Sequence, residues 1–287
     1  MNPKATTTLC CLLGHPVAHS ISPTMHNTAF EALGLDYSYM AFDITEDQIG
    51  AACDALKLMN CRGFNLTMPL KVAVIPYLDE LTQTAKLCQA VNTVINDNGK
   101  LIGHSTDGIG YMDSLADAGI DISGGTMTIL GAGGAATSII ATAAISGLKR
   151  INIFKRKNAT FSETVDFACM VTKETGCEVN VFDMADMDAL SSCIKESTIL
   201  TNATNVGMGD DDNSLIPKEF FFKDLIVSDI IYHPAKTRML KDAEEAGCRI
   251  INGKYMLLFQ GAAAFKEWTG LDMPVDLVKE KVFMEEE

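Results

Sequence analysis

The sequence predicts an α/β protein that contains a doubly wound, mostly parallel sheet. Short β-branched or apolar runs alternate with helical patterns along most of the chain, which is typical of βαβ units. A glycine-rich turn at residues 131–136 joins one such run to a long apolar helix. After about residue 236 the pattern becomes mainly helical. These observations predict a central parallel sheet with a helical tail.

An α/β unit precedes the glycine-rich turn. Ser22 and Pro23 are typical of a helix start, and Thr45 with Gln48 forms a capping box. Asn98 and Gly99 predict a tight hairpin turn. The expected strands are 9–13, 37–42, 63–67, 91–95 and 101–102, and the expected helices are 22–33, 45–59 and 108–118.

The alternation continues through the glycine-rich turn into the second half. Gly147 marks the end of the helix that follows the turn. The expected strands are 126–130, 151–154, 178–182, 197–201 and 225–230, and the expected helices after the second of these are 161–176, 186–194, 236–246, 256–268 and 275–283.

The glycine-rich turn carries a dinucleotide-binding fingerprint with alanine in the third glycine's place. Gly131 permits the tight turn, Gly133 lets the backbone approach a pyrophosphate, and Ala136 lets the helix pack on the strand. The helix N-terminus offers unpaired N–H groups to the phosphates. A Rossmann domain that binds NAD or NADP is therefore expected.

The second strand of this unit ends in a basic turn, Lys155-Arg156-Lys157, where the cofactor is selected. An acidic residue there favours NAD, whereas arginine or lysine favours NADP. No acidic residue occurs between Gly131 and Glu163, so the turn alone favours NADP. A simple solvated basic turn remains the alternative.

Composition excludes several function classes. The 287 residues carry a net charge of −14 and a pI of about 4.7, which argues against a nucleic-acid partner. No run has the length of a membrane span, and no signal peptide is evident. The nine cysteines and five histidines lack metal-ligand spacing, so no metal is expected. We expect a cytoplasmic protein with reduced, mostly buried thiols.

Polar residues recur where predicted strands end, which is where ligands bind in α/β folds. Together they supply hydroxyl and amide groups, one lysine and one carboxylate, a set suited to a polyhydroxylated acid beside a nicotinamide. Singly, Ser22 could be a helix cap, Lys71 a surface lysine, and the acidic run 210–212 a solvated turn. The candidates are Ser20, Ser22, Thr67, Lys71, Asn92, Asp107 and Gln260.

Seven motifs, in order along the chain, resemble the shikimate dehydrogenase family, most closely its quinate/shikimate dehydrogenase branch. They are Ser20-Ile21-Ser22-Pro23, Asn65-Leu66-Thr67-Met68-Pro69-Leu70-Lys71, Ala90-Val91-Asn92-Thr93, Thr106-Asp107-Gly108, Gly131-Ala132-Gly133-Gly134-Ala135, Asn202-Ala203-Thr204 and Gln260-Gly261-Ala262.

The resemblance implies two domains and a reaction. Residues 1–107, completed by 240–287, would bind substrate, and 108–239 would form the Rossmann domain. The reaction would be reversible hydride transfer between NAD(P) and shikimate or quinate. Lys71 and Asp107 match the catalytic pair: we hypothesise that Lys71 moves the hydroxyl proton and Asp107 orients it. Substrate contacts would come from all seven candidates above. Cofactor contacts would come from Gly131, Ala132, Gly133, Gly134, Ala135, Lys155, Arg156, Asn158, Thr204, Ile230, Tyr232, Gly253 and Met256.

Two departures from the branch bear on the cofactor site. Lys155 and Asn158 lean toward NADP although the branch suggests NAD, so both cofactors stay open. Tyr255 stands where the family usually has glycine, and would be strained if φ were positive there.

Three further possibilities remain. The chain could act on another cyclic hydroxy acid such as an aminoshikimate-like compound, or be a non-enzymatic dinucleotide sensor. A homodimer through a sheet edge is also possible.

Overall fold

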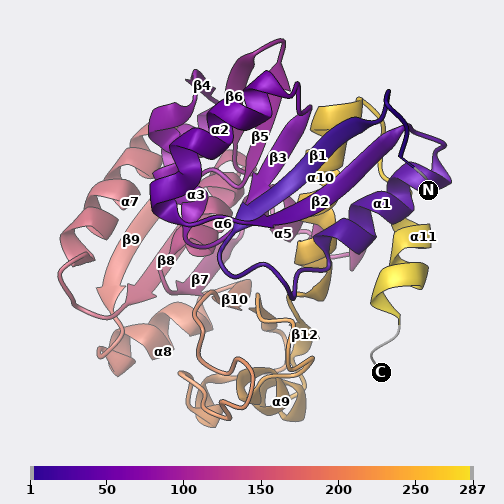
Figure 1. Cartoon of the computed structure of the whole chain (residues 1–287). Coiled ribbons are helices and arrows are strands. Elements are labelled where there is room, and N and C mark those ends of the chain that lie inside the picture. The colour runs from indigo at the N-terminus through magenta and orange to yellow at the C-terminus, as the bar shows by residue number, and fades with distance from the viewer. Residues whose placement is uncertain (1–2, 285–287) are drawn as a thin grey trace. The chain divides into compact units, whose positions relative to one another are not determined.

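The computed structural model describes residues 3–284 and divides into two compact units (Figure 1). The first consists of residues 3–110 together with 257–284, and the second of Tyr111–Met256. The expected substrate domain instead included all of 240–287. Residues 240–256 lie in the second unit because α9 (Arg238–Glu245) contacts its sheet and β12 (Arg249–Ile251), which the sequence did not predict, extends that sheet.

The first unit contains a mixed sheet in the order β2-β1-β3-β5-β6-β4. Strand β1 pairs parallel with β2 and β3, whereas β5 runs antiparallel to β3 and β6. The predicted hairpin turn is present between β5 and β6, with positive φ at Asn98 and Gly99. The strands are β1 (Thr8–Gly14), β2 (Tyr37–Asp43), β3 (Gly63–Leu66), β4 (Glu80–Leu81), β5 (Thr93–Asp97) and β6 (Lys100–His104).

Helices of the first unit bury apolar faces against this sheet. An aromatic cluster forms where α1 and α10 meet β2: the His26 ring stacks on Tyr39 with centroids 4.4 Å apart and lies 5.2 Å from the Trp268 ring centroid. The helices are α1 (Ser22–Ala32), α2 (Ile49–Leu58), α3 (Leu70–Ala73), α4 (Gln83–Cys88), α5 (Asp107–Asp117), α10 (Lys254–Thr269) and α11 (Val275–Val278), with α5 and α10 continuing into the second unit.

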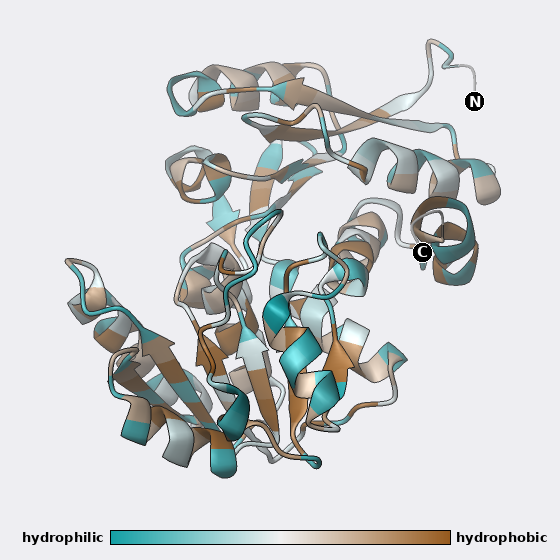
Figure 2. Cartoon of the chain, turned by 90° about the horizontal axis from the view of Figure 1, so that it is seen from below, coloured by the Kyte–Doolittle hydropathy of each residue, from teal (hydrophilic) through white to brown (hydrophobic). Residues whose placement is uncertain are grey.

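The second unit has the expected parallel, doubly wound sheet, in the order β12-β11-β10-β7-β8-β9. Its central strands are rich in apolar residues (Figure 2) and contribute side chains to two apolar clusters, as expected for a parallel sheet covered by helices. The strands are β7 (Thr126–Leu130), β8 (Arg150–Lys155), β9 (Glu178–Asp183), β10 (Ile199–Asn202), β11 (Ile226–Asp229) and β12, and the helices are α6 (Gly134–Ile145), α7 (Phe161–Thr175), α8 (Met187–Lys195) and α9.

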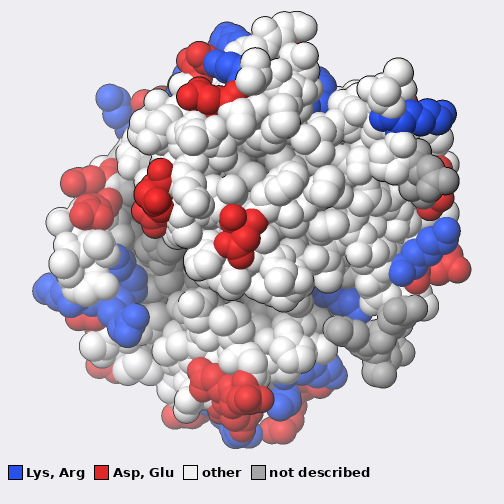
Figure 3. Space-filling model, in the orientation of Figure 1, with Lys and Arg blue, Asp and Glu red and all other residues white. Residues whose placement is uncertain are grey.

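Most charged side chains lie on the surface (Figure 3). Many of them form ion pairs, such as Lys236 with Glu244 and Arg150 with Glu178. The cysteines are free thiols, and seven of the nine are buried, whereas Cys169 is exposed and Cys193 is intermediate. Within residues 3–284 no helix combines the length and apolar character needed to cross a membrane.

Candidate active site

A lysine–aspartate pair lies just beyond the carboxyl ends of strands β3 and β6 of the first unit. Strand β3 ends at Leu66, and the chain turns through Pro69 into α3, which carries Lys71. Asp107 is the first residue of α5, where the helix dipole favours a negative charge. The Lys71 Nζ donates to Asp107 Oδ2 at 2.6 Å, and these side chains are 23% and 10% exposed. The pair is therefore largely shielded from water.

Asn92 fixes the other oxygen of Asp107. Its Nδ2 donates to Asp107 Oδ1 at 2.8 Å and lies 3.3 Å from Gln260 Oε1 on α10. Its Oδ1 accepts the backbone N–H of Thr106 at 2.6 Å. The structure thus brings together four of the predicted residues, and the carboxylate is held from two sides.

A buried chain of polar side chains supports this group, and the sequence analysis assigned it no role. Tyr39 Oη donates to Asn65 Oδ1 at 2.7 Å, and Asn65 Nδ2 donates to Thr93 Oγ1 at 3.0 Å. Thr93 Oγ1 lies 3.0 Å from Thr106 Oγ1, beside Asn92. Fully paired buried networks of this kind hold side chains rigidly. The sequence signal for them was polar residues within otherwise apolar strands.

Three predicted substrate residues lie outside this hydrogen-bonded group in the described structure. Ser20 Oγ accepts the backbone N–H of Ser22 at 3.3 Å. Ser22 is the first residue of α1, and the N-cap is Ile21 without a side-chain cap, so capping by Ser22 was a wrong expectation. Thr67 follows β3 and packs against the end of β1, where a Cβ on Gly14 would meet its methyl group at 2.2 Å.

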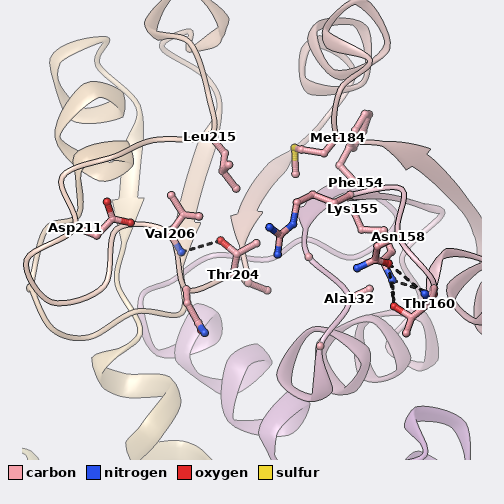
Figure 4. A pocket seen from close by; sticks show the side chains of 15 residues that line it. Ala132, Phe154, Lys155, Asn158, Thr160, Met184, Thr204, Val206, Asp211 and Leu215 are labelled. Atoms are coloured by element: carbon pink, nitrogen blue, oxygen red, sulfur yellow. Dashed lines mark hydrogen bonds between the residues drawn. The ribbon is translucent and has the colours of Figure 1, made fainter.

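The second unit has a cavity of ≈ 590 Å³ beside the glycine-rich turn (Figure 4). Gly131 has φ +101°, and a Cβ there would lie 2.8 Å from the carbonyl oxygen of Ala203. A Cβ on Gly133 or Gly134 would meet no atom within 4 Å. The turn therefore needs glycine at Gly131 for its conformation and leaves open backbone at the N-terminus of α6. Ala135 lies in the first turn of α6, outside the cavity lining.

The basic turn lies at one side of this cavity, but its cations differ in their surroundings. Lys155 Nζ donates to Thr160 O at 2.9 Å, Thr160 Oγ1 at 2.7 Å and Thr164 Oγ1 at 3.1 Å. Its three protons are thus directed at α7 and the residues before it. Asn158 Oδ1 accepts from the backbone N–H of Thr160. Arg156 also lines the cavity. Arg156 is therefore better placed than Lys155 to meet an anion.

The opposite wall is formed by residues 203–206 with Asp211 and Leu215 (Figure 4). Thr204, a predicted cofactor residue, lies in this wall. Asp211 Oδ2 accepts the backbone N–H of Gly207 at 3.0 Å, so its carboxylate shapes the wall. The sequence analysis interpreted the acidic run 210–212 as a solvated turn; the structure keeps this run in a loop, with Asp211 also lining the cavity. No local pattern distinguished it from its two neighbours.

The remaining predicted cofactor residues lie near the ends of β11 and β12. A Cβ on Gly253 would be 1.9 Å from the carbonyl oxygen of Ile230, so only glycine fits there. Met256 is buried, and Tyr232 is exposed. Tyr255 lies in the first turn of α10, and the non-glycine residues with positive φ among residues 3–284 are Asn60, Gln89 and Asn98. The strain considered for Tyr255 is therefore absent.

Two family models match the chain. The shikimate dehydrogenase substrate binding domain matches residues 12–94, and the shikimate 5'-dehydrogenase C-terminal domain matches residues 255–283. The chain is 48% identical over 279 residues to a shikimate dehydrogenase (NADP(+)) of Listeria innocua, covering 96% of each chain. It is 43% identical to a quinate/shikimate dehydrogenase of Escherichia coli, covering 98% of each.

Among solved structures, the chain resembles a shikimate 5-dehydrogenase from Listeria monocytogenes in complex with shikimate and NAD. The TM-score is 0.96 at 46% identity, with 99% of each chain covered.

Proposed function

The chain belongs to the shikimate dehydrogenase family, and from this premise we propose that it transfers a hydride reversibly between NAD(P) and shikimate/3-dehydroshikimate. Quinate/3-dehydroquinate is proposed as a second substrate pair, since one relative is named for both acids. The observation that carries the proposal is the Lys71–Asp107 pair, held at 2.6 Å and fixed by Asn92.

The pair suits the proton step of alcohol oxidation. When bound, the nicotinamide supplies or accepts the hydride, so the protein must handle the hydroxyl proton. In the neutral form Lys71 takes this proton at Nζ as the alcohol is oxidised, and in the reverse direction its ammonium group returns it to the carbonyl oxygen. Asp107 Oδ2 accepts a hydrogen bond from Lys71 Nζ, which orients the amine so that it faces the substrate hydroxyl.

The other predicted substrate residues supply recognition. In this proposal Ser20 and Ser22 hold the carboxylate, while Thr67, Asn92 and Gln260 contact ring hydroxyls. Asn92 and Gln260 already form one hydrogen-bonded set with Asp107. A substrate hydroxyl that completes this set would leave no buried polar group unpaired, which is the basis of strong selectivity for hydroxyl groups.

The second unit's cavity fits a dinucleotide. Its volume of ≈ 590 Å³, the open backbone at Gly133 and Gly134 and the N-terminus of α6 suit a pyrophosphate. Either NAD or NADP is proposed as cofactor. A 2′-phosphate would meet Arg156 and the amide of Asn158 rather than Lys155, whose ammonium group is bound to Thr160 and Thr164.

The test is steady-state oxidation of shikimate and of quinate, each with NAD and with NADP. Turnover of shikimate is expected, and the four kcat/KM values rank both acids and both cofactors. Cofactor binding without turnover of either acid would overturn the proposed substrates and favour another cyclic hydroxy acid. Absence of cofactor binding would overturn the dehydrogenase assignment itself.

A further inference from the structure

A second buried aspartate lies in the second unit, outside the catalytic pair. Asp229 ends β11 and is 1% exposed. Its carboxylate accepts four hydrogen-bond contacts from three donor groups: Asn202 Nδ2 at 3.1 Å to each oxygen, the backbone N–H of Ile231 at 3.0 Å and Thr237 Oγ1 at 2.8 Å. Both oxygens are therefore engaged by neutral donors that come from separate segments of the chain.

Asn202 connects this carboxylate to the cavity wall. Its Oδ1 accepts from the Thr204 backbone N–H at 3.1 Å and from Thr204 Oγ1 at 2.7 Å. Its Nδ2 also lies 3.2 Å from the carbonyl oxygen of Val206. The partners of the Asn202 amide thus identify its donor and acceptor ends. One side chain binds both Thr204 and Val206 of segment 203–206.

Segment 203–206 is the wall that faces the glycine-rich turn. The carbonyl oxygen of Ala203 would be only 2.8 Å from a Cβ on Gly131. Thr204 Oγ1 accepts the backbone N–H of Val206 at 3.1 Å, which closes the segment into a compact turn. A small rotation of Asn202 would therefore move the wall relative to the turn that is proposed to hold the pyrophosphate.

Asp229 also fixes the segment that follows β11. Thr237 is the N-cap of α9, and its hydroxyl both donates to Asp229 and accepts the backbone N–H of Leu240. The Ile231 N–H bond holds the chain beside Ile230, whose carbonyl oxygen touches Gly253. One carboxylate thus joins the cavity wall, the start of α9 and the β11–α9 connection.

The burial of the Asp229 carboxylate lowers the stability of the fold. Burial raises its pKa to about 6, and the bonds from Ile231, Asn202 and Thr237 oppose that rise only in part. The cations at the start of α9 and just before it are paired elsewhere: Lys236 with Glu244, and Arg238 with Asp242. At neutral pH the group is a carboxylate without an ion-pair partner among the described residues. Buried ionisable groups with a perturbed pKa concentrate at functional sites.

From this geometry we propose that Asp229 is a positioning residue for the cofactor. Acting through Asn202, it holds segment 203–206 at the distance from the glycine-rich turn that a dinucleotide requires. The proposal rests on the proposed function in taking NAD(P) as the ligand of the cavity. A carboxylate suits the role because it is an acceptor only, so every donor around it can be satisfied at once.

The experiment is Asp229→Asn in the full chain, with the Kd of NADP and of NAD measured by calorimetry without substrate. The carboxamide presents N–H protons to a site lined by donors, so Asn202 must rotate. We expect both Kd values to rise by about 10- to 100-fold, the effect of losing one hydrogen bond to a charged group. At saturating cofactor, the KM for shikimate is expected to stay within about twofold.

Two further variants separate positioning from general destabilisation. Leu190→Ala opens a cavity in the same unit's core at a residue that neither bonds to Asp229 nor lines the cofactor cavity, and should lower Tm while leaving the Kd of NADP unchanged. Thr237→Val removes the hydroxyl that donates to Asp229 and should raise the Kd of NADP. Thr237→Ser keeps this hydroxyl, so its Kd should stay near that of the wild type.

The outcomes are distinguishable. If Asp229→Asn lowers Tm as Leu190→Ala does but binds NADP and NAD as the wild type does, Asp229 is only structural and the inference is overturned. If the wild type itself binds neither cofactor, the proposed function fails first. Raised Kd values in Asp229→Asn with normal binding by Leu190→Ala support the inference even if shikimate is not the substrate.

Discussion

Two aspartates, one in each unit, show how the same side chain is put to different use. Asp107 has an ammonium partner, Lys71, and keeps 10% of its side chain exposed at a helix N-terminus. Asp229 has only neutral hydrogen-bond donors and is 1% exposed. A carboxylate beside a cation can direct a proton, whereas one surrounded by neutral donors can only hold its neighbours in place. In our two proposals, therefore, one aspartate takes part in proton transfer and the other holds its neighbours in place.

The largest expected effect tests the reactive pair. Lys71→Ala removes the group that we propose moves the proton, so kcat should fall by about 10²- to 10⁴-fold, the usual contribution of general acid–base catalysis. The Kd of NADP should not change. Steady-state kinetics and calorimetry check this, with Lys86→Ala, on the exposed side of α4, as the matched control. A loss shared equally between kcat and KM would remove Lys71 from the proton step.

The next effect concerns the stability cost of Asp229. Its folded pKa of about 6 exceeds the ordinary value of 3.8, so between these values the folded state binds more protons than the unfolded state. The free energy of unfolding therefore falls as pH rises from about 4 to 6, by about 3 kcal/mol for this group. Urea denaturation of the wild type and Asp229→Asn measures it. The difference between their pH slopes should vanish above about pH 7; equal slopes at pH 4–6 would contradict the assignment.

The first unit should show the opposite dependence. His26 is fully buried, and burial lowers its pKa from 6.5 to about 3. Below pH 6.5 the unfolded state binds a proton that the folded state does not, so this contribution is lost as pH falls, by about 2 kcal/mol at pH 5. Both ring nitrogens lack a hydrogen-bond partner in the described structure, so His26→Leu leaves no polar group unpaired. That variant should lose less stability between pH 7 and 5 than the wild type; parallel curves would contradict this.

The smallest effect concerns the basic turn. Arg156→Ala should lower kcat/KM with NADP by about tenfold relative to NAD, since one exposed cation on a phosphate contributes on the order of 1 kcal/mol. Lys155→Ala removes bonds to Thr160 and Thr164 instead, and should weaken binding of both cofactors alike. The ratio of the two kcat/KM values distinguishes the variants. A change of the ratio in Lys155→Ala alone would reverse their proposed roles.

The sequence predicted those parts of the fold that depend on residues close together in the chain. The Asn98-Gly99 turn, the Gly131 turn and the parallel sheet of the second unit follow from φ preferences and apolar runs. The missed strand β12 has three residues and is defined by pairing with β11 rather than by its own pattern. Register with a distant strand cannot be read from three residues.

The candidate site divides in the same way. Motifs and a family resemblance predicted that Lys71, Asn92, Asp107 and Gln260 share one site. Their separation along the chain gives no such indication. Side-chain direction was less predictable: Lys155 has the expected charge, but its ammonium group is bound by the threonines of its own segment. The motifs predicted which residues belong to each site. The hydrogen-bond partners of those residues depend on packing, and only the structure shows them.

The buried thiols can report the unfolding of each unit separately. Cys10, Cys11, Cys53, Cys61 and Cys88 are buried in the first unit, and Cys177 and Cys248 in the second, whereas Cys169 is exposed. A thiol-alkylating reagent should therefore modify Cys169 in the native protein and the buried cysteines only when their unit opens. Peptide mass spectrometry of samples labelled across a urea series at one pH would then show which half of the chain unfolds first, without any engineered probe.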